Sequence, residues 1–246
     1  MTPPLYHGYR RTDFSCHFRA AILVHPHAPL PDNRWVWRTE FFDAFPQADL
    51  AFLAQGYHLV YLDLQNLYGS PPAILAMDQF YDQLLLQFSL ASKMILEGFS
   101  RGGLFALNWA IKNPEKVAGI YLDAPVCDFK SWPAGRGTGC GSPEDWERCK
   151  KVYDLSEEQA LSYPFNPIDQ LEPIAKEGIP IFAVYGDQDE VVPMEENIQI
   201  LEARYQALGG KIESIIKPGC GHHPHSLEDP RPILDFFKAN STDAPK

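Results

Sequence analysis

Short apolar runs alternate with segments of helical spacing along most of the chain, and this alternation restricts the possible folds more than any other feature. Apolar runs predict strands over residues 14–18, 20–25, 58–64, 93–99, 117–126, 179–185 and 211–216. Apolar residues spaced three or four apart predict helices over 38–55, 72–88, 101–113, 194–208 and 232–239. Several strands are apolar on both faces, which is typical of strands buried between two helical layers. The pattern therefore predicts an α/β fold with a mostly parallel, doubly covered sheet.

One segment, residues 129–175, interrupts the alternation between the fifth and sixth predicted strands. It holds two tryptophans, four glycines and a short helical piece near residues 144–153. A plain crossover helix with tight loops needs far fewer residues. We therefore expect a small lid-like insertion at 129–175, within a single domain that spans residues 1–246.

Charge and composition exclude several classes of protein. The formal net charge is −11, and no cluster of Lys and Arg is long enough to contact a nucleic acid. No apolar run approaches the roughly 18 residues of a membrane span, so no membrane partner is expected. Residues 1–6 lack a basic region followed by an apolar one, which predicts no signal peptide and a cytoplasmic protein.

The five cysteines favour reduced thiols, because their number is odd and no metal-type Cys-x-x-Cys pair occurs. Cys140 and Cys149 flank one loop and could pair in an oxidising compartment. The sequence leaves that alternative open, and it also leaves the oligomeric state open.

The string Gly98-Phe99-Ser100-Arg101-Gly102 lies between a predicted buried strand and a predicted helix. This strand–turn–helix setting is that of a nucleophile elbow. The sharp turn strains the serine and leaves no room for side chains two residues before and after it, which explains the two glycines. The string predicts that Ser100 is a nucleophile, and that the backbone N–H of Arg101 stabilises an oxyanion at the start of the helix.

A serine nucleophile needs a histidine base and a carboxylate that orients it. In an α/β sheet both follow the serine in the order Ser, acid, His. Residues 184–193 come after the sixth strand and contain Asp187 and Asp189, whereas residues 218–225 come after the seventh and contain three histidines. Ligands bind at the carboxyl ends of parallel strands, where all these segments should meet.

Together these motifs resemble the α/β-hydrolase superfamily. Residues 98–102 match its elbow, residues 186–193 (Gly-Asp-Gln-Asp-Glu-Val-Val-Pro) resemble its acid loop, and Gly221-His222 resembles its histidine loop. The resemblance covers residues 20–240 and implies that the sheet is of the α/β-hydrolase type. It also implies that Asp189, three residues after the glycine, is the catalytic acid and that His222 is the base.

Alternatives remain for both residues. Asp187 could be the acid, although it is better suited to cap its loop by accepting hydrogen bonds from backbone N–H groups. Asp123, at the end of the fifth strand, stands where some relatives of the fold place the acid. His223 and His225 compete with His222 for the role of base.

The histidines could also suggest a metal site. His222, His223 and His225 lie close in sequence, and His25 and His27 could add further ligands. No His-Glu-x-x-His motif and no Cys/His zinc spacing supports this hypothesis, so we expect neither a metal nor another cofactor.

The second oxyanion donor departs from the family pattern. The resemblance places it in the loop after the strand at 20–24, where the family has a His-Gly pair. Here that loop begins His25-Pro-His-Ala-Pro, and proline has no N–H to donate. Trp35 or a neighbour within residues 27–36 is therefore the expected donor.

Aromatic and basic residues near the predicted site suggest what it binds. Trp37, Arg38, Tyr68 and Trp132 are the predicted substrate-binding residues, with Trp35, Arg101 and Arg136 beside them. Aromatic faces stack on sugar rings or line acyl pockets, and Arg pairs with carboxylates. For each tryptophan, ordinary packing in the core is the alternative.

The sequence predicts a serine hydrolase that cleaves a small-molecule or carbohydrate carboxylic ester through an acyl-enzyme, with a Ser100–His222–Asp189 triad. Esters of decorated carbohydrates are the favoured subclass by analogy of fold and composition. The alternatives are a peptidase similar to the prolyl oligopeptidase catalytic domain, and a hydrolase-like protein that binds a ligand without catalysis.

Overall fold

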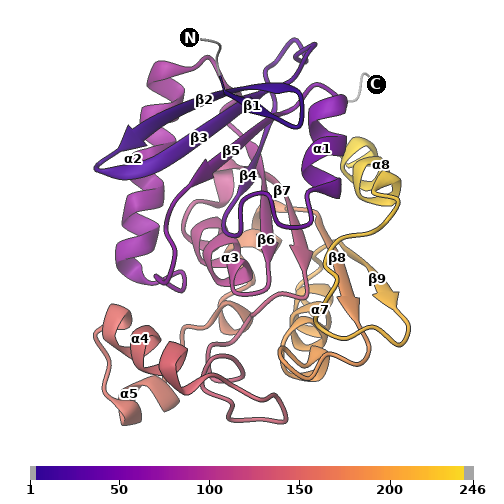
Figure 1. Cartoon of the computed structure of the whole chain (residues 1–246). Helices are drawn as coiled ribbons and strands as arrows, with labels where there is room; N and C mark the ends of the chain where they lie inside the picture. The colour runs from indigo at the N-terminus through magenta and orange to yellow at the C-terminus, as the bar shows by residue number, and fades with distance from the viewer. Residues whose placement is uncertain (1–3, 241–246) are drawn as a thin grey trace.

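A nine-stranded sheet runs through the centre of the computed structural model, which describes residues 4–240 (Figure 1). Its strand order is β1-β2-β3-β5-β4-β6-β7-β8-β9. The strands are β1 (Leu5–Tyr6), β2 (Tyr9–Cys16), β3 (Arg19–His25), β4 (Trp35–Arg38), β5 (His58–Leu62), β6 (Met94–Phe99), β7 (Val117–Asp123), β8 (Ile181–Gly186) and β9 (Ile212–Lys217). From β5 to β9 every neighbouring pair is parallel, whereas β1, β2 and β3 join by antiparallel pairing. The mostly parallel sheet predicted from the sequence is confirmed.

Helices cover both faces of the sheet, as expected. They are α1 (Gln47–Ala54), α2 (Pro71–Gln87), α3 (Gly102–Lys112), α4 (Pro143–Tyr153), α5 (Glu157–Leu161), α6 (Glu172–Glu177), α7 (Ile198–Ala207) and α8 (Arg231–Ala239), with short 3-10 turns at Pro114–Lys116, Pro167–Asp169 and Met194–Glu196. Helices α2, α3, α6 and α7 contribute to the hydrophobic core on one face, and α1 and α8 to the core on the other. Successive side chains of a strand point to opposite faces of the sheet, so one strand contributes to both cores. In β4, Trp35 and Trp37 belong to the first core and Val36 belongs to the second.

The helix predicted over residues 38–55 is wrong in its first half. Residues 35–38 form the central strand β4, which pairs with β5 on one side and β6 on the other. Helix α1 begins only at Gln47. Between them, Phe41, Asp43 and Phe45 have positive φ values of 55°, 70° and 52°, which a right-handed helix cannot accommodate. The aromatic spacing that suggested a helix belongs to a loop that packs its rings against the sheet.

The first predicted strand is longer than expected and differently placed. Strand β2 begins at Tyr9 and ends at Cys16, and its exposure alternates along its length. His17 and Phe18, with φ values of 45° and 69°, form the turn to β3. The two strands therefore make an antiparallel hairpin at one end of the sheet.

Residues 124–180 connect β7 to β8 and hold helices α4, α5 and α6. Figure 1 shows α4 and α5 beyond the carboxyl ends of the parallel strands, separated from the main helical layers. Residues of this segment, among them Phe129 and, on α4, Trp146, form a small hydrophobic cluster with Tyr68 and Leu104 from the body of the protein. The segment thus packs over the carboxyl edge of the sheet, and a lid function for 129–175 stays a prediction.

Cys140 and Cys149 do not pair in this structure. Cys149 is buried on α4, whereas Cys140 is exposed, and all five cysteines are free. Among the helices within residues 4–240, none combines the length and the hydropathy that crossing a bilayer requires.

Candidate active site

Ser100 lies in the turn between β6 and α3, and its backbone is strained. Its φ of 50° is in the left-handed region, which is costly for any residue other than glycine. A Cβ atom at Gly98 would lie 2.9 Å from the carbonyl oxygen of Gly102, and one at Gly102 would lie 3.1 Å from Thr39 Oγ1. The turn is held in place partly because the Ser100 N–H donates to the carbonyl of Asp123. Gly98 is therefore required by close packing against the backbone, and Gly102 packs tightly against the Thr39 side chain.

A chain of two hydrogen bonds leads from Ser100 to Asp189. Ser100 Oγ lies 2.9 Å from His222 Nε2, and His222 Nδ1 lies 2.7 Å from Asp189 Oδ2. The side chains of His222 and Asp189 are only 8% and 1% exposed. The structure thus places a hydroxyl, an imidazole and a carboxylate in series, each from a loop after a different strand. This is the geometry in which an imidazole can accept the proton of a serine.

Backbone groups hold the acid loop after β8. Asp189 Oδ1 accepts hydrogen bonds from the N–H groups of Val191 (2.9 Å) and Val192 (2.8 Å), which fixes the carboxylate while its other oxygen faces His222. Asp187 is exposed and accepts from the N–H of Gly219 at 2.6 Å. Asp187 therefore links the acid loop to the histidine loop. It accepts a hydrogen bond from a backbone N–H group, which is the capping role expected from the sequence.

A second His–Asp pair lies beside the first. His225 Nδ1 lies 2.7 Å from Asp123 Oδ1, and both side chains are buried. Asp123 Oδ2 accepts from the Ser226 N–H and from the Tyr121 hydroxyl. The rings of His222 and His225 have centroids 4.9 Å apart. Asp123 and His225, one of the alternative acids and one of the alternative bases considered from the sequence, thus bind each other.

Comparison with known proteins agrees with this architecture. The family model for the alpha/beta hydrolase fold matches residues 23–159, which is more than half of the chain. The chain belongs to the α/β-hydrolase family. The fold class and the superfamily resemblance stated from the sequence motifs are therefore confirmed.

Solved structures share the fold at low sequence identity. The acylaminoacyl peptidase of Pyrococcus horikoshii is 14% identical with a TM-score of 0.68, and the match covers 97% of this chain and 42% of that chain. A puromycin-hydrolyzing peptidase of Mycobacterium tuberculosis is 13% identical with a TM-score of 0.72, covering 99% and 41%. A provisionally assigned lipase of Acinetobacter baumannii is 14% identical with a TM-score of 0.63, covering 95% and 93%. The present chain thus spans about two fifths of the length of the two peptidases.

Two backbone segments meet beside Ser100, where an oxyanion would form. The N–H of Arg101 belongs to the first turn of α3, where N–H groups have no intrahelical acceptor. The loop after β4 lies against this turn, because Arg101 Nε donates to Glu40 Oε1 at 2.9 Å. The Thr39 N–H in this loop is already bound to the carbonyl of Glu97. The amides of Glu40 and Phe41 are the next ones along the chain and are therefore candidates for the second donor.

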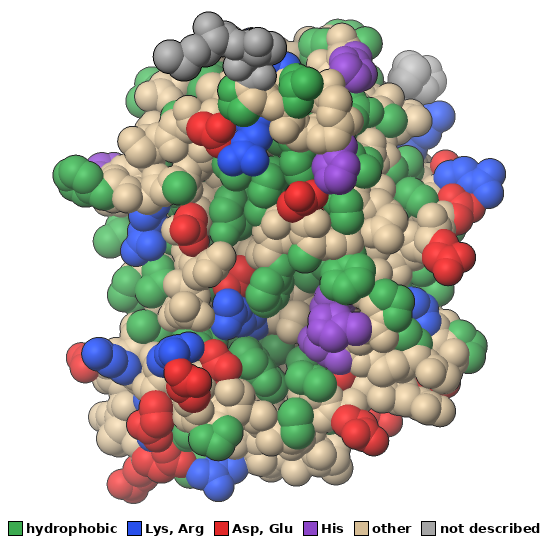
Figure 2. Space-filling view, in the orientation of Figure 1, with side chains coloured by type: hydrophobic (Ala, Val, Ile, Leu, Met, Phe, Trp, Pro, Cys, Tyr) green, Lys and Arg blue, Asp and Glu red, His purple; other side chains and the backbone are tan. Residues whose placement is uncertain are grey.

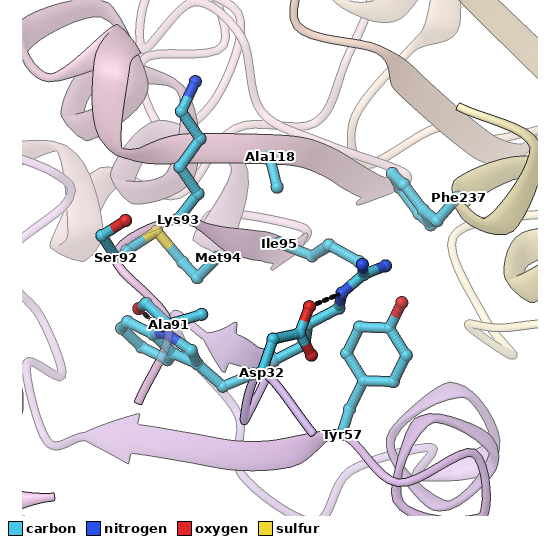
Figure 3. Close-up of a pocket in the computed structure, with 11 residues that line it drawn as sticks. Asp32, Tyr57, Ala91, Ser92, Lys93, Met94, Ile95, Ala118 and Phe237 are labelled. Carbon is cyan, nitrogen blue, oxygen red and sulfur yellow. Dashed lines mark hydrogen bonds and ion pairs between the residues drawn. The ribbon is translucent and has the colours of Figure 1, made fainter. Parts of the chain in front are cut away.

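The loop at 27–36, in which the second donor was expected, lies at the wrong edge of the sheet. Strand β3 is antiparallel to β5, so β3 ends at the amino edge of the parallel strands, away from Ser100. Residues of that loop line a cavity of about 440 Å³ there, together with Tyr57, Lys93 and Phe237 (Figure 3). The sequence pattern predicted a strand at 20–25 but carried no information about its direction.

Trp35 itself cannot supply the donor, and that expectation is wrong. It begins β4, where the next residue, Val36, pairs with Ile95. Trp35 is thus level with the start of β6, about 20 Å before Ser100 at roughly 3.3 Å per residue. Its indole N–H donates instead to the carbonyl of Ala91.

Two of the predicted substrate-binding residues belong to the core. Trp37 is 1% exposed and Arg38 is fully buried. Arg38 Nη1 lies 3.1 Å from both Asp49 and Glu97, and the rest of its guanidinium binds backbone carbonyls of the loop after β4. Since a buried cation is stable only when its donors are satisfied, Arg38 holds this loop in place and does not contact substrate. Trp37 packs against other aromatic rings of the core.

Trp132 of the insertion lies near Tyr68, which precedes helix α2. Their ring centroids are 6.3 Å apart, and Trp132 is half-buried. Tyr68 is fully buried, and its hydroxyl donates to Asp145 of α4 at 2.5 Å. A substrate-binding role for this pair stays a prediction.

An ion-pair network next to Ser100 was not anticipated. Arg101 Nη2 lies 2.7 Å from Glu40 Oε1, and Arg101 Nη1 lies 3.6 Å from Asp145 on α4. Burial raises the pKa of the Glu40 carboxyl to about 7, and the neighbouring Arg101 opposes this shift. The network joins the elbow to the β4 loop and to the insertion. Only the neighbouring position of Arg101 and Ser100 in the chain could have signalled it.

The three histidines after β9 lie together, with His223 exposed, His222 partly buried and His225 buried. Figure 2 shows histidine side chains grouped on one face and bordered by hydrophobic ones. One nitrogen from each of His222, His223 and His225 lies within 4.8 Å of the others, so this cluster could hold a metal ion. His25 and His27 follow β3 at the opposite edge and take no part in it.

Proposed function

We propose that this protein is a serine hydrolase that cleaves carboxylic esters through an acyl-enzyme. The observation that carries the proposal is the series Ser100–His222–Asp189, with contacts of 2.9 and 2.7 Å. A serine hydroxyl is a poor nucleophile unless a base accepts its proton. Here the base is held in place by a buried carboxylate that is itself fixed by two backbone N–H groups.

The proposed reaction has two halves. In the first, His222 Nε2 takes the proton of Ser100 as Oγ attacks the ester carbonyl. The C–O bond to the alcohol then breaks as His222 returns the proton to the leaving oxygen. In the second, His222 takes a proton from water as the water oxygen attacks the acyl-enzyme. The bond from the acyl carbon to Ser100 Oγ then breaks as His222 returns that proton to Oγ, which releases the acid and the free serine. Asp189 holds the Nδ1–H of His222 throughout, and the Arg101 N–H stabilises the oxyanion.

The kind of ester that is cleaved depends on the residues around the triad. Esters of decorated carbohydrates were favoured because of an aromatic rim, but Trp35 and Trp37 lie in the core. Tyr68 and Trp132 remain near the site, and of these only Trp132 is partly exposed. We therefore propose carboxylic ester hydrolysis, with acetylated sugars as one arm of the substrate panel.

Peptide hydrolysis is the second candidate. It is favoured by the two solved peptidases, which share the fold over 97–99% of this chain. At 13–14% identity this likeness concerns the fold, and the chain spans only part of their length. The same triad could cleave an amide, so the substrate panel decides between the two candidates.

Covalent labelling tests the nucleophile without knowledge of the substrate. A fluorophosphonate should add one phosphonyl group to the wild-type protein, as measured by intact mass. Ser100→Ala should abolish labelling, whereas Ser162→Ala should be labelled at the wild-type rate, because the Ser162 hydroxyl only binds carbonyls within α5. Labelling that survives in Ser100→Ala would refute the proposed nucleophile.

A substrate panel then tests the bond. We expect p-nitrophenyl acetate and butyrate, and acetylated sugars, to be hydrolysed by the wild type and not by Ser100→Ala. Faster turnover of acylaminoacyl p-nitroanilides than of any ester would favour the peptidase. A protein that neither labels nor turns over any substrate would be a binding protein.

A further inference from the structure

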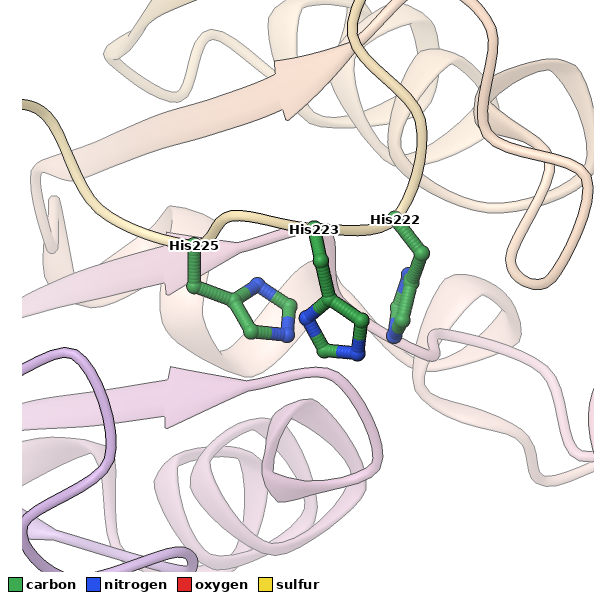
Figure 4. A group of neighbouring side chains, drawn as sticks. All are labelled: His222, His223 and His225. Carbon is green, nitrogen blue, oxygen red and sulfur yellow. The ribbon is translucent and has the colours of Figure 1, made fainter.

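We propose that His222, His223 and His225 form a binding site for a divalent transition metal such as Zn²⁺, and that the bound metal reversibly inhibits the triad. The three rings project from the same side of one loop and lie next to one another (Figure 4). One nitrogen from each lies within 4.8 Å of the other two. Imidazole nitrogen is a preferred ligand of Zn²⁺, and three protein ligands with an open fourth position are typical of accessible zinc sites.

Two of the histidines are already oriented as metal ligands usually are. A ligating histidine almost always donates its other ring N–H to a carboxylate or a carbonyl, which fixes the tautomer and makes the ligating nitrogen more basic. His222 Nδ1 lies 2.7 Å from Asp189, and His225 Nδ1 lies 2.7 Å from Asp123. In both rings this leaves Nε2 as the nitrogen that carries the lone pair, and in His222 that lone pair faces Ser100 Oγ at 2.9 Å. One such pair is explained by the triad, whereas the second has no role in the proposed reaction.

The third histidine has the freedom that closing the site requires. His223 is exposed, and within residues 4–240 no group hydrogen-bonds to its ring, which stacks on Phe45 with centroids 5.6 Å apart. Zn–N bonds of about 2.0–2.1 Å place tetrahedral ligand nitrogens roughly 3.4 Å apart. The cluster therefore needs a contraction of up to about 1.4 Å, and His223 is the ligand whose side chain is free to rotate toward the other two.

Charge around the cluster favours a cation on balance. Asp189 and Asp123 each contact one of the ligand rings directly. The neighbouring cations do not contact the ligand rings directly. Lys217 Nζ binds the backbone carbonyls of Pro224 and Ser226. The Arg38 guanidinium lies against the ring of Phe99, which in turn packs against His225. Two carboxylates next to the ligands offset the charge of a divalent ion more closely than these cations oppose it.

The proposed metal would inhibit the enzyme because one of its ligands, His222, is also the proposed catalytic base. This inhibitory role rests on the proposed function. His222 Nε2 is the atom that lies 2.9 Å from Ser100 Oγ. A nitrogen whose lone pair binds a metal cannot accept the serine proton. Zn²⁺ should therefore suppress turnover, and removal of the metal with EDTA should restore it.

Binding is tested on the full chain by calorimetric titration with Zn²⁺. We expect saturable binding of one ion per chain, with affinity lowered at least about 10-fold in His223→Gln and in His225→Asn. The asparagine amide can still donate to Asp123, so His225→Asn removes Nε2 and keeps that buried bond. His27→Gln is the matched control, because His27 is a histidine stacked on Tyr9 and separate from the cluster. Its affinity should equal that of the wild type.

Two outcomes would overturn the metal site. One is the absence of saturable binding up to about 1 mM Zn²⁺. The other is an affinity that His223→Gln and His27→Gln leave equally unchanged. Thermal unfolding of each variant without metal shows whether a lost affinity reflects a misfolded protein, and a variant that is unfolded is replaced by His223→Asn.

The metal site and the proposed function can fail separately. Ser100→Ala should still bind Zn²⁺, so binding does not depend on activity. In the wild type, Zn²⁺ should slow labelling of Ser100 by the fluorophosphonate, and His223→Gln should need a higher Zn²⁺ concentration for the same protection. Binding without any protection would contradict the inhibitory role, and absence of labelling without metal would contradict the proposed function alone.

Discussion

Two His–Asp pairs lie next to each other at the carboxyl edge of the sheet, and they differ in what lies beyond the imidazole. Both have Nδ1-to-carboxylate distances of 2.7 Å and buried side chains. His222 reaches Ser100 Oγ at 2.9 Å, whereas the ring of His225 packs against Phe45 and Phe99. An oriented imidazole is therefore not a catalytic base by itself. The position of the strained serine decides which pair can take part in the reaction.

The largest expected difference between the pairs is in activity after loss of the histidine. His222→Ala should lower kcat/KM by roughly 10⁴-fold or more, because the proton acceptor for Ser100 is lost. His225→Asn should cost less than about 10²-fold, since that ring does not contact the reacting atoms. Initial rates with a p-nitrophenyl ester measure both. Equal losses would mean that the two pairs act as one catalytic unit.

The carboxylates should separate activity from stability. Asp189→Asn should lower kcat by roughly 10³–10⁴-fold, because the amide no longer holds the imidazole in the required tautomer. Asp123→Asn should lower kcat by less than about 10-fold. Each carboxylate accepts three hydrogen bonds.

Both asparagine variants should therefore lose a similar free energy of unfolding, on the order of 1–3 kcal/mol. Urea titration measures this loss and also serves as the control for folding. A much larger activity loss in Asp123→Asn than in Asp189→Asn would reverse the assignment of the acid.

The stability comparison has to be made at one pH because of Glu40. Burial raises the pKa of this carboxyl to about 7 in the folded protein, above its usual value of 4.5. The folded state therefore holds the proton more tightly, so this contribution to stability is fully present below pH 4.5 and is lost as the pH rises to about 7. We expect it to amount to a few kcal/mol.

Glu40→Gln should flatten the fall in the free energy of unfolding between pH 4.5 and 7. Urea titrations of the variant and the wild type at several pH values measure the two slopes. Equal slopes would show that another group causes the pH dependence.

The smallest effect is expected at Asp187, which stands two residues from Asp189 and serves as its matched control. Its carboxylate accepts from the Gly219 N–H and joins the acid loop to the histidine loop. Asp187→Asn should cost about 0.5–1.5 kcal/mol of stability and only a few-fold in kcat/KM. A loss of activity comparable to that of Asp189→Asn would show that the two loops are held together mainly by this bond.

The sequence by itself determined the parts whose constraints are local. Gly98 is required by a contact within the turn itself, because a Cβ atom there would lie 2.9 Å from the carbonyl oxygen of Gly102, so this part of the elbow was readable as a string. Asp189 and His222 follow strands that are recognisable as apolar runs. The loops after parallel strands all lie at the carboxyl edge of the sheet. The α/β class and the doubly covered sheet were also predictable, because strands that are buried on both faces are apolar along their whole length.

Only the tertiary structure decided the features that depend on partners distant in the chain. The four residues of β4 form a central strand because β5 and β6 pair with them on both sides, and this turned Trp35, Trp37 and Arg38 from predicted site residues into core. The direction of β3, which put the expected oxyanion loop at the wrong edge, is likewise a property of its pairing. Asp123 and His225 are 102 residues apart, and their pairing arises because β7 and the loop after β9 end beside each other. The type of a residue and its spacing in a pattern indicate whether its side chain is buried. They do not indicate which distant group that side chain contacts.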